Sequence, residues 1–356
     1  MTKMKHVLTS AAKTTLLVSF LGLRLFLGTR EPEFHDGVSD AVAAPSPPLP
    51  LRRKKTAMCM IVTDEEAYLD EFVDYHRALG FDAFFVYDNT AGFEMRQWGA
   101  LKGAHVRVTH FPGPARQMAA YAACGAAVAA TGDFEWAAFL DADEFLVLKR
   151  HADVADLLAA HCPRGGLGVN WFVFGANGWN VRAPEPVTRR FLYRDAGVNP
   201  HVKTLVRVDD MAEFRRADPH NFVVLKDRMV LRDSNGKDIE GPFNERGPAD
   251  VVVLHHYHRK SHKEYFWKRR RGRSDLDPAD PAIELLIHSA NRSLSEGLAG
   301  DHLPMDDSIS KDPNQVFDDS AWRFLKNHVP GYALYDDIAL RPAADASASA
   351  FLSTSD

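Results

Sequence analysis

Residues 58–88, MCMIVTDEEAYLDEFVDYHRALGFDAFFVYD, change the spacing of their apolar side chains twice. The stretch begins with an apolar run that ends at Thr63, which predicts a buried strand. Apolar residues then recur every three or four positions, which predicts an amphipathic helix. Thr63 and Glu66 have the spacing of a capping box, and Gly80 stands where a helix commonly ends. A second apolar run at 83–87 predicts another strand, so the stretch forms a strand–helix–strand unit.

The same alternation continues along the chain. Further strands are predicted at 105–108 and 136–140, and an alanine-rich helix is predicted at 116–130. Strands that alternate with helices at this spacing form an α/β fold, with a mainly parallel sheet covered by helices on both faces. Ligands of such folds bind beyond the carboxyl ends of the strands. Polar residues follow several of these strands, so a ligand site is expected at that edge of the sheet.

Charged residues interrupt the apolar segment WAAFLDADEFLVL at 136–148. If the segment continues as a strand, Asp141 and Asp143 point the same way. Their carboxylates then repel each other unless a cation compensates, and Mn²⁺ or Mg²⁺ prefers such oxygen ligands and can bridge them to a diphosphate. The alternative is an acidic strand exit that is simply solvated. The apolar flanks favour the metal site, because bare carboxylates are costly to bury.

Several further stretches have the residues and the order of a known family. They are CMIVTDEEAYLDEFVDYHRALGFDAFFVYDN, FLDADEFL, WFVFG, KTLVR, PHNF and HHYHRKSHKEYFWKRRRGR, which span about residues 59–273. The final pattern, HY..KS..E(Y/F)..K..RG, is the most specific of them. On these motifs the chain resembles glycosyltransferase family 92. The resemblance implies a Rossmann-like GT-A fold with a C-terminal helical and basic extension, and a transferase that uses a nucleotide-diphosphate sugar.

The resemblance also assigns site residues. It makes Asp141 and Asp143 the metal and diphosphate motif, with His256 as an additional metal ligand. The family usually has Asn-Glu where this chain has Asp64-Glu65, which leaves the role of Asp64 open. It also has DVDEF where this chain has DADEF, a conservative change.

Residues 259–273, RKSHKEYFWKRRRGR, carry eight Lys or Arg against one acid. Composition alone favours a solvated helix face, and nucleic acid or acidic lipid is an alternative partner. The aromatic residues at 265–267 indicate instead that one side packs on the domain and leaves selected cations for a diphosphate. Three of the cations match the family pattern. The side chains expected to bind the donor are Asp64, Asp88, Gln117, Asp141, Lys260, Lys268 and Arg271.

The resemblance implies transfer of a hexosyl unit, galactose, from a UDP-sugar to a hydroxyl of a glycan acceptor. Inversion at the anomeric carbon needs a carboxylate base for the acceptor proton. Glu144 lies near the motif in sequence, although strand alternation turns it away from the two aspartates. The acids Asp227 and Asp233 are alternatives.

Three other functions share parts of this pattern. A sugar-1-phosphate nucleotidyltransferase can have the same sheet, but it carries a glycine-rich loop after the first strand, and TDEEAYLDEF contains no glycine. A phosphatase with an aspartyl nucleophile has its D-x-D after the first strand, followed closely by Thr or Ser. A lumenal sugar-binding or scaffold protein that has lost activity would keep the same motifs.

The start of the chain has the features of a membrane anchor. Residues 1–30 are basic, lack acids before Glu31, and contain the apolar run TTLLVSFLGLRLFLG, which predicts a signal-anchor or signal peptide. An organelle transit peptide is the alternative. Residues 31–55 form a Pro-rich stem, 56–335 the catalytic domain, and 336–356 a disordered tail. This layout predicts a type II protein of the Golgi or ER lumen, or a secreted one after signal cleavage.

Composition limits the remaining choices. The formal net charge of -5 provides no basic field for nucleic acid. The three cysteines are too few for a disulfide framework, and buried thiols are expected in preference to a single bridge. Asn291 begins a glycosylation sequon, which matters only in a lumenal protein.

Overall fold

The computed structural model describes residues 55–215, 218–271 and 313–338. The predicted anchor, nearly all of the predicted stem, the sequon and most of the predicted tail lie outside the described residues. Within the described ranges, no helix is both long and apolar enough to cross a membrane.

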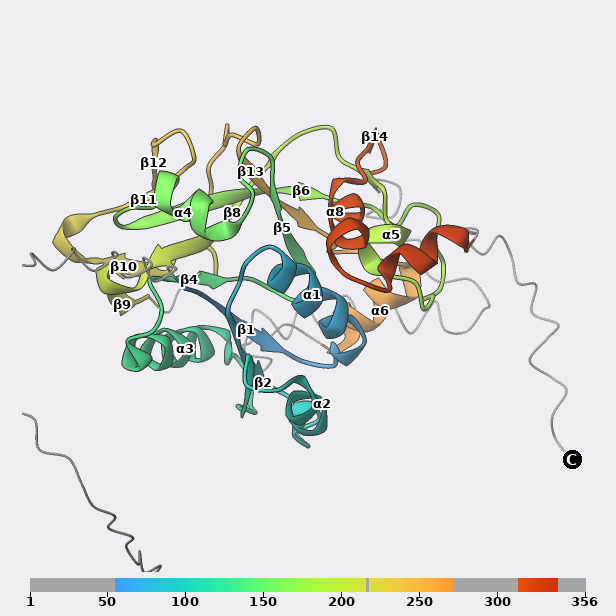
Figure 1. Cartoon of the computed structure of the whole chain (residues 1–356), viewed down its shortest axis with the longest axis horizontal. Coiled ribbons are helices and arrows are strands. Elements are labelled where there is room, and N and C mark those ends of the chain that lie inside the picture. Colours follow the sequence, from blue (N-terminus) through green and yellow to red (C-terminus); the bar gives the residue numbers. More distant parts are fainter. Residues whose placement is uncertain (1–54, 216–217, 272–312, 339–356) are drawn as a thin grey trace, which may run out of the picture. The chain divides into compact units, whose positions relative to one another are not determined.

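A ten-stranded sheet forms the centre of the structure (Figure 1). Its main order is β12-β11-β6-β8-β4-β1-β2-β3, and β13 joins β6 to β5 at one end. The neighbours β4, β1, β2 and β3 are parallel, whereas β8 runs antiparallel between β4 and β6. The strands are β1 (Thr56–Val62), β2 (Ala83–Asp88), β3 (Val106–His110), β4 (Trp136–Phe139), β5 (Glu144–Leu148), β6 (Gly166–Val173), β8 (Asn199–Arg207), β11 (Leu231–Arg232), β12 (Asp238–Ile239) and β13 (Val252–His256).

Helices cover both faces of this sheet, as predicted (Figure 1). Alternate residues of β1 separate the two layers, because Met58 and Met60 pack under α1 whereas Cys59 packs under α3. The α/β prediction is therefore confirmed. The helices are α1 (Glu66–Ala78), α2 (Met95–Lys102), α3 (Gln117–Thr131), α4 (Val154–His161), α5 (Val187–Arg190), α6 (His262–Arg271) and α8 (Ser320–His328). Two small antiparallel sheets of two strands each lie outside the large sheet: β9 (Met211–Phe214) with β10 (Val223–Leu225), and β7 (Tyr193–Arg194) with β14 (Val316–Phe317).

The start of α1 differs from the prediction. The residue before the helix is Glu65, and no side chain caps the helix, so the proposed capping box of Thr63 and Glu66 is wrong. The physical reason is that Asp64 has a left-handed backbone, with φ of 51°, which turns the chain between strand and helix. Gly80, with φ of 105°, does follow the end of α1 as expected.

A disulfide joins the central strand to α3. It links Cys59 of β1 to Cys124, whose Cα atoms are 5.9 Å apart, so the expectation of three free thiols is wrong. The two residues face each other because they lie on the contacting faces of strand and helix. They are 65 residues apart in the sequence, so the sequence alone did not indicate that they are close. Cys162 is a buried free thiol, as expected.

His76 of α1 is fully buried and uses both ring nitrogens. Nδ1 donates to the carbonyl of Phe72 at 2.8 Å, and Nε2 accepts from the amide of Leu146 at 3.3 Å. Burial lowers the pKa of His76 from 6.5 to about 3. The neutral ring is therefore part of the folded state, and a proton on Nε2 would remove the bond to β5.

We expect this histidine to make the fold sensitive to acid. Because its folded pKa is depressed, its contribution is complete above about pH 6.5 and is lost as the pH falls toward 3. Over that window one proton costs up to about 1.4 kcal/mol per pH unit. His76→Gln should lower the free energy of unfolding at pH 8, because the buried ring is lost. It should also make that free energy depend less steeply on pH, by the contribution of the one proton that His76 binds on unfolding. Urea unfolding of both proteins at pH 8, 6 and 4 measures it, and equal slopes would contradict the assignment.

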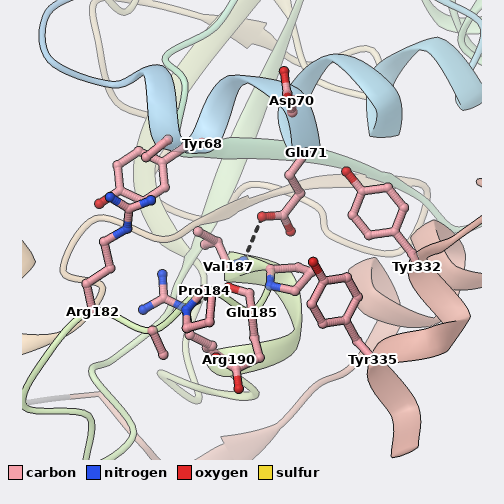
Figure 2. A pocket seen from close by; sticks show the side chains of 13 residues that line it. Tyr68, Asp70, Glu71, Arg182, Pro184, Glu185, Val187, Arg190, Tyr332 and Tyr335 are labelled. Carbon is pink, nitrogen blue, oxygen red and sulfur yellow. Dashed lines mark hydrogen bonds between the residues drawn. The ribbon is translucent and has the colours of Figure 1, made fainter. Parts of the chain in front are cut away.

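The C-terminal described segment packs on α1 and encloses a pocket. α8 contacts both α1 and the 3₁₀ turn η3 (Tyr332–Asp337), and the hydroxyl of Tyr332 donates to Asp74 of α1 at 3.2 Å. Between α1, the 182–190 segment and η3 lies a pocket of about 130 Å³ (Figure 2). Its wall on the α1 side is formed by the first two turns of the helix, directly after the carboxyl end of β1.

Candidate functional site

The two motif aspartates lie in a turn and not in a continued strand. β4 ends at Phe139, and the amide of Glu144 donates to the carbonyl of Asp141 at 3.0 Å before β5 begins. The expectation that the segment continues as one strand is therefore wrong. Asp141 and Asp143 remain close enough to interact electrostatically, but their carboxylates have different partners.

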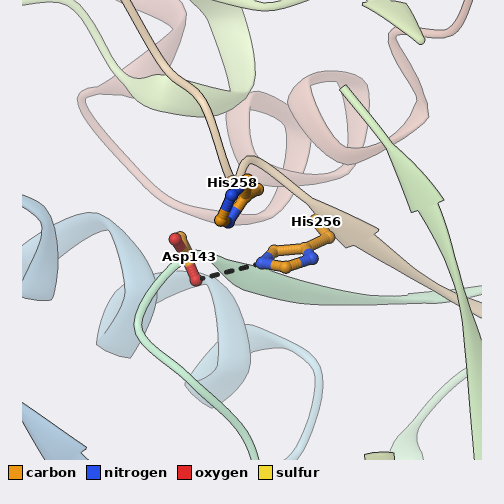
Figure 3. A group of neighbouring side chains, drawn as sticks. All are labelled: Asp143, His256 and His258. Atoms are coloured by element: carbon orange, nitrogen blue, oxygen red, sulfur yellow. Dashed lines mark ion pairs between the residues drawn. The ribbon is translucent and has the colours of Figure 1, made fainter. Parts of the chain in front are cut away.

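Asp143 lies among two histidines of the β13 end. Its Oδ1 is 3.5 Å from Nε2 of His256, and one ligand atom each of Asp143, His256 and His258 lie within 4.8 Å of one another (Figure 3). The sheet register explains this, because His256 pairs directly with Glu144, the neighbour of Asp143. The amide of Tyr257 also donates to the Asp143 carbonyl at 2.8 Å.

Two lysines of the basic segment point at the same carboxylate. Nζ of Lys268 lies 2.5 Å and Nζ of Lys260 3.4 Å from Oδ2 of Asp143, which is 2% exposed. Burial would raise the pKa of Asp143, but Lys268 and Lys260 outweigh it and hold that pKa well below its usual range. Lys260 is itself buried and has a left-handed backbone, with φ of 55°. Such strain in a non-glycine residue is typical of functional sites.

These side chains fit a divalent cation that carries a diphosphate. Burial lowers the pKa of both His256 and His258, so their imidazoles are neutral and can donate a lone pair. One carboxylate and two imidazoles can together hold a divalent metal ion, and the carboxylate is the kind of ligand that Mn²⁺ or Mg²⁺ prefers. Two ammonium groups beside a metal would repel it, unless phosphate oxygens lie between the cations. A metal alone is thus a poorer fit than a metal–diphosphate pair.

Asp141 has a separate set of partners. Nζ of the fully buried Lys203 lies 2.7 Å from its Oδ2, while Gln117 and Tyr121 of α3 donate to Oδ1 at 3.1 and 3.0 Å. Burial would raise the pKa of Asp141, but Lys203 outweighs it and the pKa is lowered. Asp141 is not a member of the acid–histidine group of Figure 3. Its side chain is 35% exposed, so it still reaches the surface beside that group.

The three acids considered as the base lie elsewhere or are occupied. Glu144 is fully buried, accepts from the amide of Asp141 at 3.0 Å, and has a pKa that burial raises well above its usual value. Asp227 is 80% exposed and pairs with Arg164, which precedes β6 at the opposite edge of the sheet from Asp141. Asp233 is buried and accepts bonds from its own turn and from Asn244.

The remaining predicted donor residues fall into two groups. Gln117 and Arg271 face the site edge: Gln117 contacts Asp141, and Arg271 binds the carbonyl of Thr63 and, at 3.0 Å, the carboxylate of Glu65. Asp88 is fully buried and accepts bonds from Thr90 and from the amide of Met95. Asp64 is exposed and contributes its carbonyl to Arg271. The carboxylate of Asp88 therefore holds the loop before α2 in place.

Two residues at this site were not given roles from the sequence. Lys203 lies within the apolar part of β8, and a lysine in a central strand is a signal that a buried anion must be near. His258 stands two residues after His256, the spacing that returns a side chain to the same face of an extended segment.

Comparison with known proteins gives an independent result. Residues 54–164 match the family model for Glycosyltransferase family 92. A glycosyltransferase family 92 protein of Oryza sativa subsp. japonica is 30% identical over 166 residues, which is 44% of this chain and 28% of that protein. One from Ricinus communis is 28% identical over 138 residues, or 37% of this chain and 25% of that protein. The chain thus matches about a quarter of the length of these relatives.

Among solved structures, a 4-diphosphocytidyl-2C-methyl-D-erythritol synthase aligns over 44% of this chain and 77% of its own, with 12% identity and a TM-score of 0.29.

Proposed function

We propose that this chain is a metal-dependent glycosyltransferase of family 92, because residues 54–164 match the model of that family. The observation that carries the proposal is the group of buried Asp143, buried His256 and half-buried His258, with two lysines directed at Asp143. The donor is a UDP-sugar, the transferred unit a hexose such as galactose, and the acceptor a glycan hydroxyl.

Each group of residues has its own role in the proposed reaction. Asp143, His256 and His258 would hold Mn²⁺ or Mg²⁺, and such an ion would neutralise charge on the departing diphosphate. Lys260 and Lys268 bind the diphosphate oxygens and stabilise the same developing charge. Asp141, held in place by its buried lysine and by α3, binds the nucleoside end of the donor. Inversion is part of the proposal, and its base is a group other than Glu144 or Asp227.

We also propose that the protein works in a secretory lumen and is attached to the membrane through its first 30 residues. The Cys59–Cys124 disulfide supports an oxidising compartment. The basic run followed by an apolar run at the start of the sequence supports the anchor.

Donor binding should raise the thermal stability of the protein only when metal is present. A ligand that binds the folded form alone at 100 times its Kd stabilises by about 2.7 kcal/mol, which corresponds to roughly 5 °C in Tm for a domain of this size. We expect this shift for UDP with Mn²⁺, and little shift for UDP with EDTA or for CDP with Mn²⁺. Equal shifts with and without metal would contradict the metal-dependent site.

A further inference from the structure

The pocket between α1, the 182–190 segment and η3 is separate from the acid–histidine group yet adjacent to it. Tyr68 forms the shared wall: its ring lines the pocket, and Nζ of Lys260 lies 4.6 Å from the ring centroid. The same lysine is 3.4 Å from Asp143. A molecule in the pocket is therefore one aromatic side chain away from the groups that we assign to the donor.

The wall between the two sites is held firmly. The hydroxyl of Tyr68 donates to Glu264 at 2.8 Å, and Arg190 binds both oxygens of Glu264 at 2.8 and 3.0 Å. Arg190 and Glu264 are almost completely buried. Glu71, which lines the pocket, accepts a hydrogen bond from the amide of Val187 (Figure 2) and two more from the amide and hydroxyl of Thr188. The pocket is thus formed before any ligand arrives, which lowers the entropic cost of binding.

Two of the lining side chains have unused hydrogen-bonding capacity. Oε2 of Glu185 is buried and has no hydrogen-bond partner among the described residues. Arg182 is exposed, and the interaction found for its guanidinium within the described ranges is with the Tyr68 ring, at 5.4 Å. A buried acceptor without a partner is uncommon, so this lining residue offers an acceptor that the described part of the protein leaves unsatisfied.

Aromatic rings face these polar groups. Tyr332 and Tyr335 of η3 lie across the pocket from Tyr68 and Arg182 (Figure 2). Tyrosines provide apolar ring surface with a polar tip, and the guanidinium and carboxylate provide one strong donor and one strong acceptor. A pyranose matches this combination, because it has C–H faces for the rings and hydroxyls that both donate and accept. A nucleotide phosphate matches it less well, since Glu71 and Glu185 would repel it.

We propose that this pocket binds the terminal sugar of the glycan acceptor, with Arg182 and Glu185 on its hydroxyls and the tyrosines against its ring. The inference rests on the proposed transferase function, since it assigns the second substrate of the same reaction. The acceptor sugar would then lie in the pocket that Tyr68 lines, and the donor diphosphate would lie beyond Tyr68, beside Lys260.

Ligand-observed NMR tests the pocket without requiring turnover. The full-length protein is mixed with methyl β-D-galactopyranoside, methyl α-L-fucopyranoside or methyl N-acetyl-β-D-glucosaminide, and saturation transfer gives the affinity of each. We expect at least one glycoside to bind, and its affinity to fall at least tenfold in Arg182→Ala and in Glu185→Gln. Arg150→Ala is the matched control, because Arg150 is an exposed arginine paired with Asp250 outside the pocket.

A second probe separates this inference from the transferase proposal. UDP with Mn²⁺ should bind Arg182→Ala and Glu185→Gln as it binds the wild type. Unchanged glycoside binding in both variants, or no glycoside binding by the wild type, overturns the acceptor pocket. Weakened UDP binding in both variants overturns it too, because the pocket would then belong to the donor. If the wild type binds a glycoside but not UDP with Mn²⁺, sugar binding is upheld and the transferase proposal fails.

Discussion

Asp143→Asn should reduce sugar transfer by about a thousandfold, equivalent to roughly 4 kcal/mol of transition-state stabilisation. The substitution keeps the shape of the side chain but removes the charge that faces His256, Lys260 and Lys268. Without that charge the site loses its anionic metal ligand, and the two lysines lose their counter-ion. Release of UDP from a UDP-sugar in the presence of Mn²⁺ measures the effect, with Mn²⁺ affinity as a second readout.

Asp227→Asn is the matched control for this experiment. Asp227 is 80% exposed and pairs with Arg164 at the opposite edge of the sheet, so its loss should leave the rate unchanged. A circular dichroism melt of both variants confirms that each is folded. Retention of the wild-type rate by Asp143→Asn, with the fold intact, would contradict the assignment of the site.

Lys203→Met should lower the free energy of unfolding by about 3–5 kcal/mol. Lys203 is fully buried between Asp141, at 2.7 Å, and Glu144, at 3.5 Å. Burial would lower the pKa of Lys203, but these two acids raise it well above its usual value, so the ammonium is charged in the folded protein. Its removal leaves the Asp141 carboxylate and the buried carboxyl group of Glu144 without the ammonium group that lies between them. Urea unfolding at pH 8 measures the loss.

Lys237→Met provides the comparison, since Lys237 is exposed and its replacement should change stability by no more than about 0.5 kcal/mol. In the Lys203→Met background, Glu144→Gln should recover part of the lost stability, because it removes one of the uncompensated groups. A loss in Lys203→Met as small as that of the exposed control would mean that the lysine does not neutralise these acids.

The amino-terminal half of the fold could be predicted from local pattern. Strand β1, helix α1 and strand β2 each lie within two or three residues of their predicted bounds, because their apolar periodicity is long and unambiguous. The turn at Asp141–Asp143 could not be predicted. It contains no glycine or proline, and the apolar residues on either side imitate one continuous strand.

The candidate site was predictable to the extent that its members follow strand ends. Asp143, His256, Lys260 and Lys268 meet in the structure, as the family motifs imply. The partner of Asp141 was not predictable, because Lys203 is 62 residues away and reaches it through the antiparallel pairing of β8 with β4. The aromatic residues at 265–267 were expected to pack on the domain, but Trp267 is 59% exposed. The helix α6 is attached instead through the ion pair of Glu264 with Arg190.

The Cys59–Cys124 disulfide affects how the protein should be produced. Gln117, Tyr121 and Cys124 follow one another at helical spacing on α3, so the bridge to β1 anchors the same face of the helix that contacts Asp141. Production in a reducing bacterial cytoplasm would leave that helix without its covalent link to β1. Samples refolded or expressed under oxidising conditions should therefore bind nucleotide more tightly than reduced ones of identical sequence.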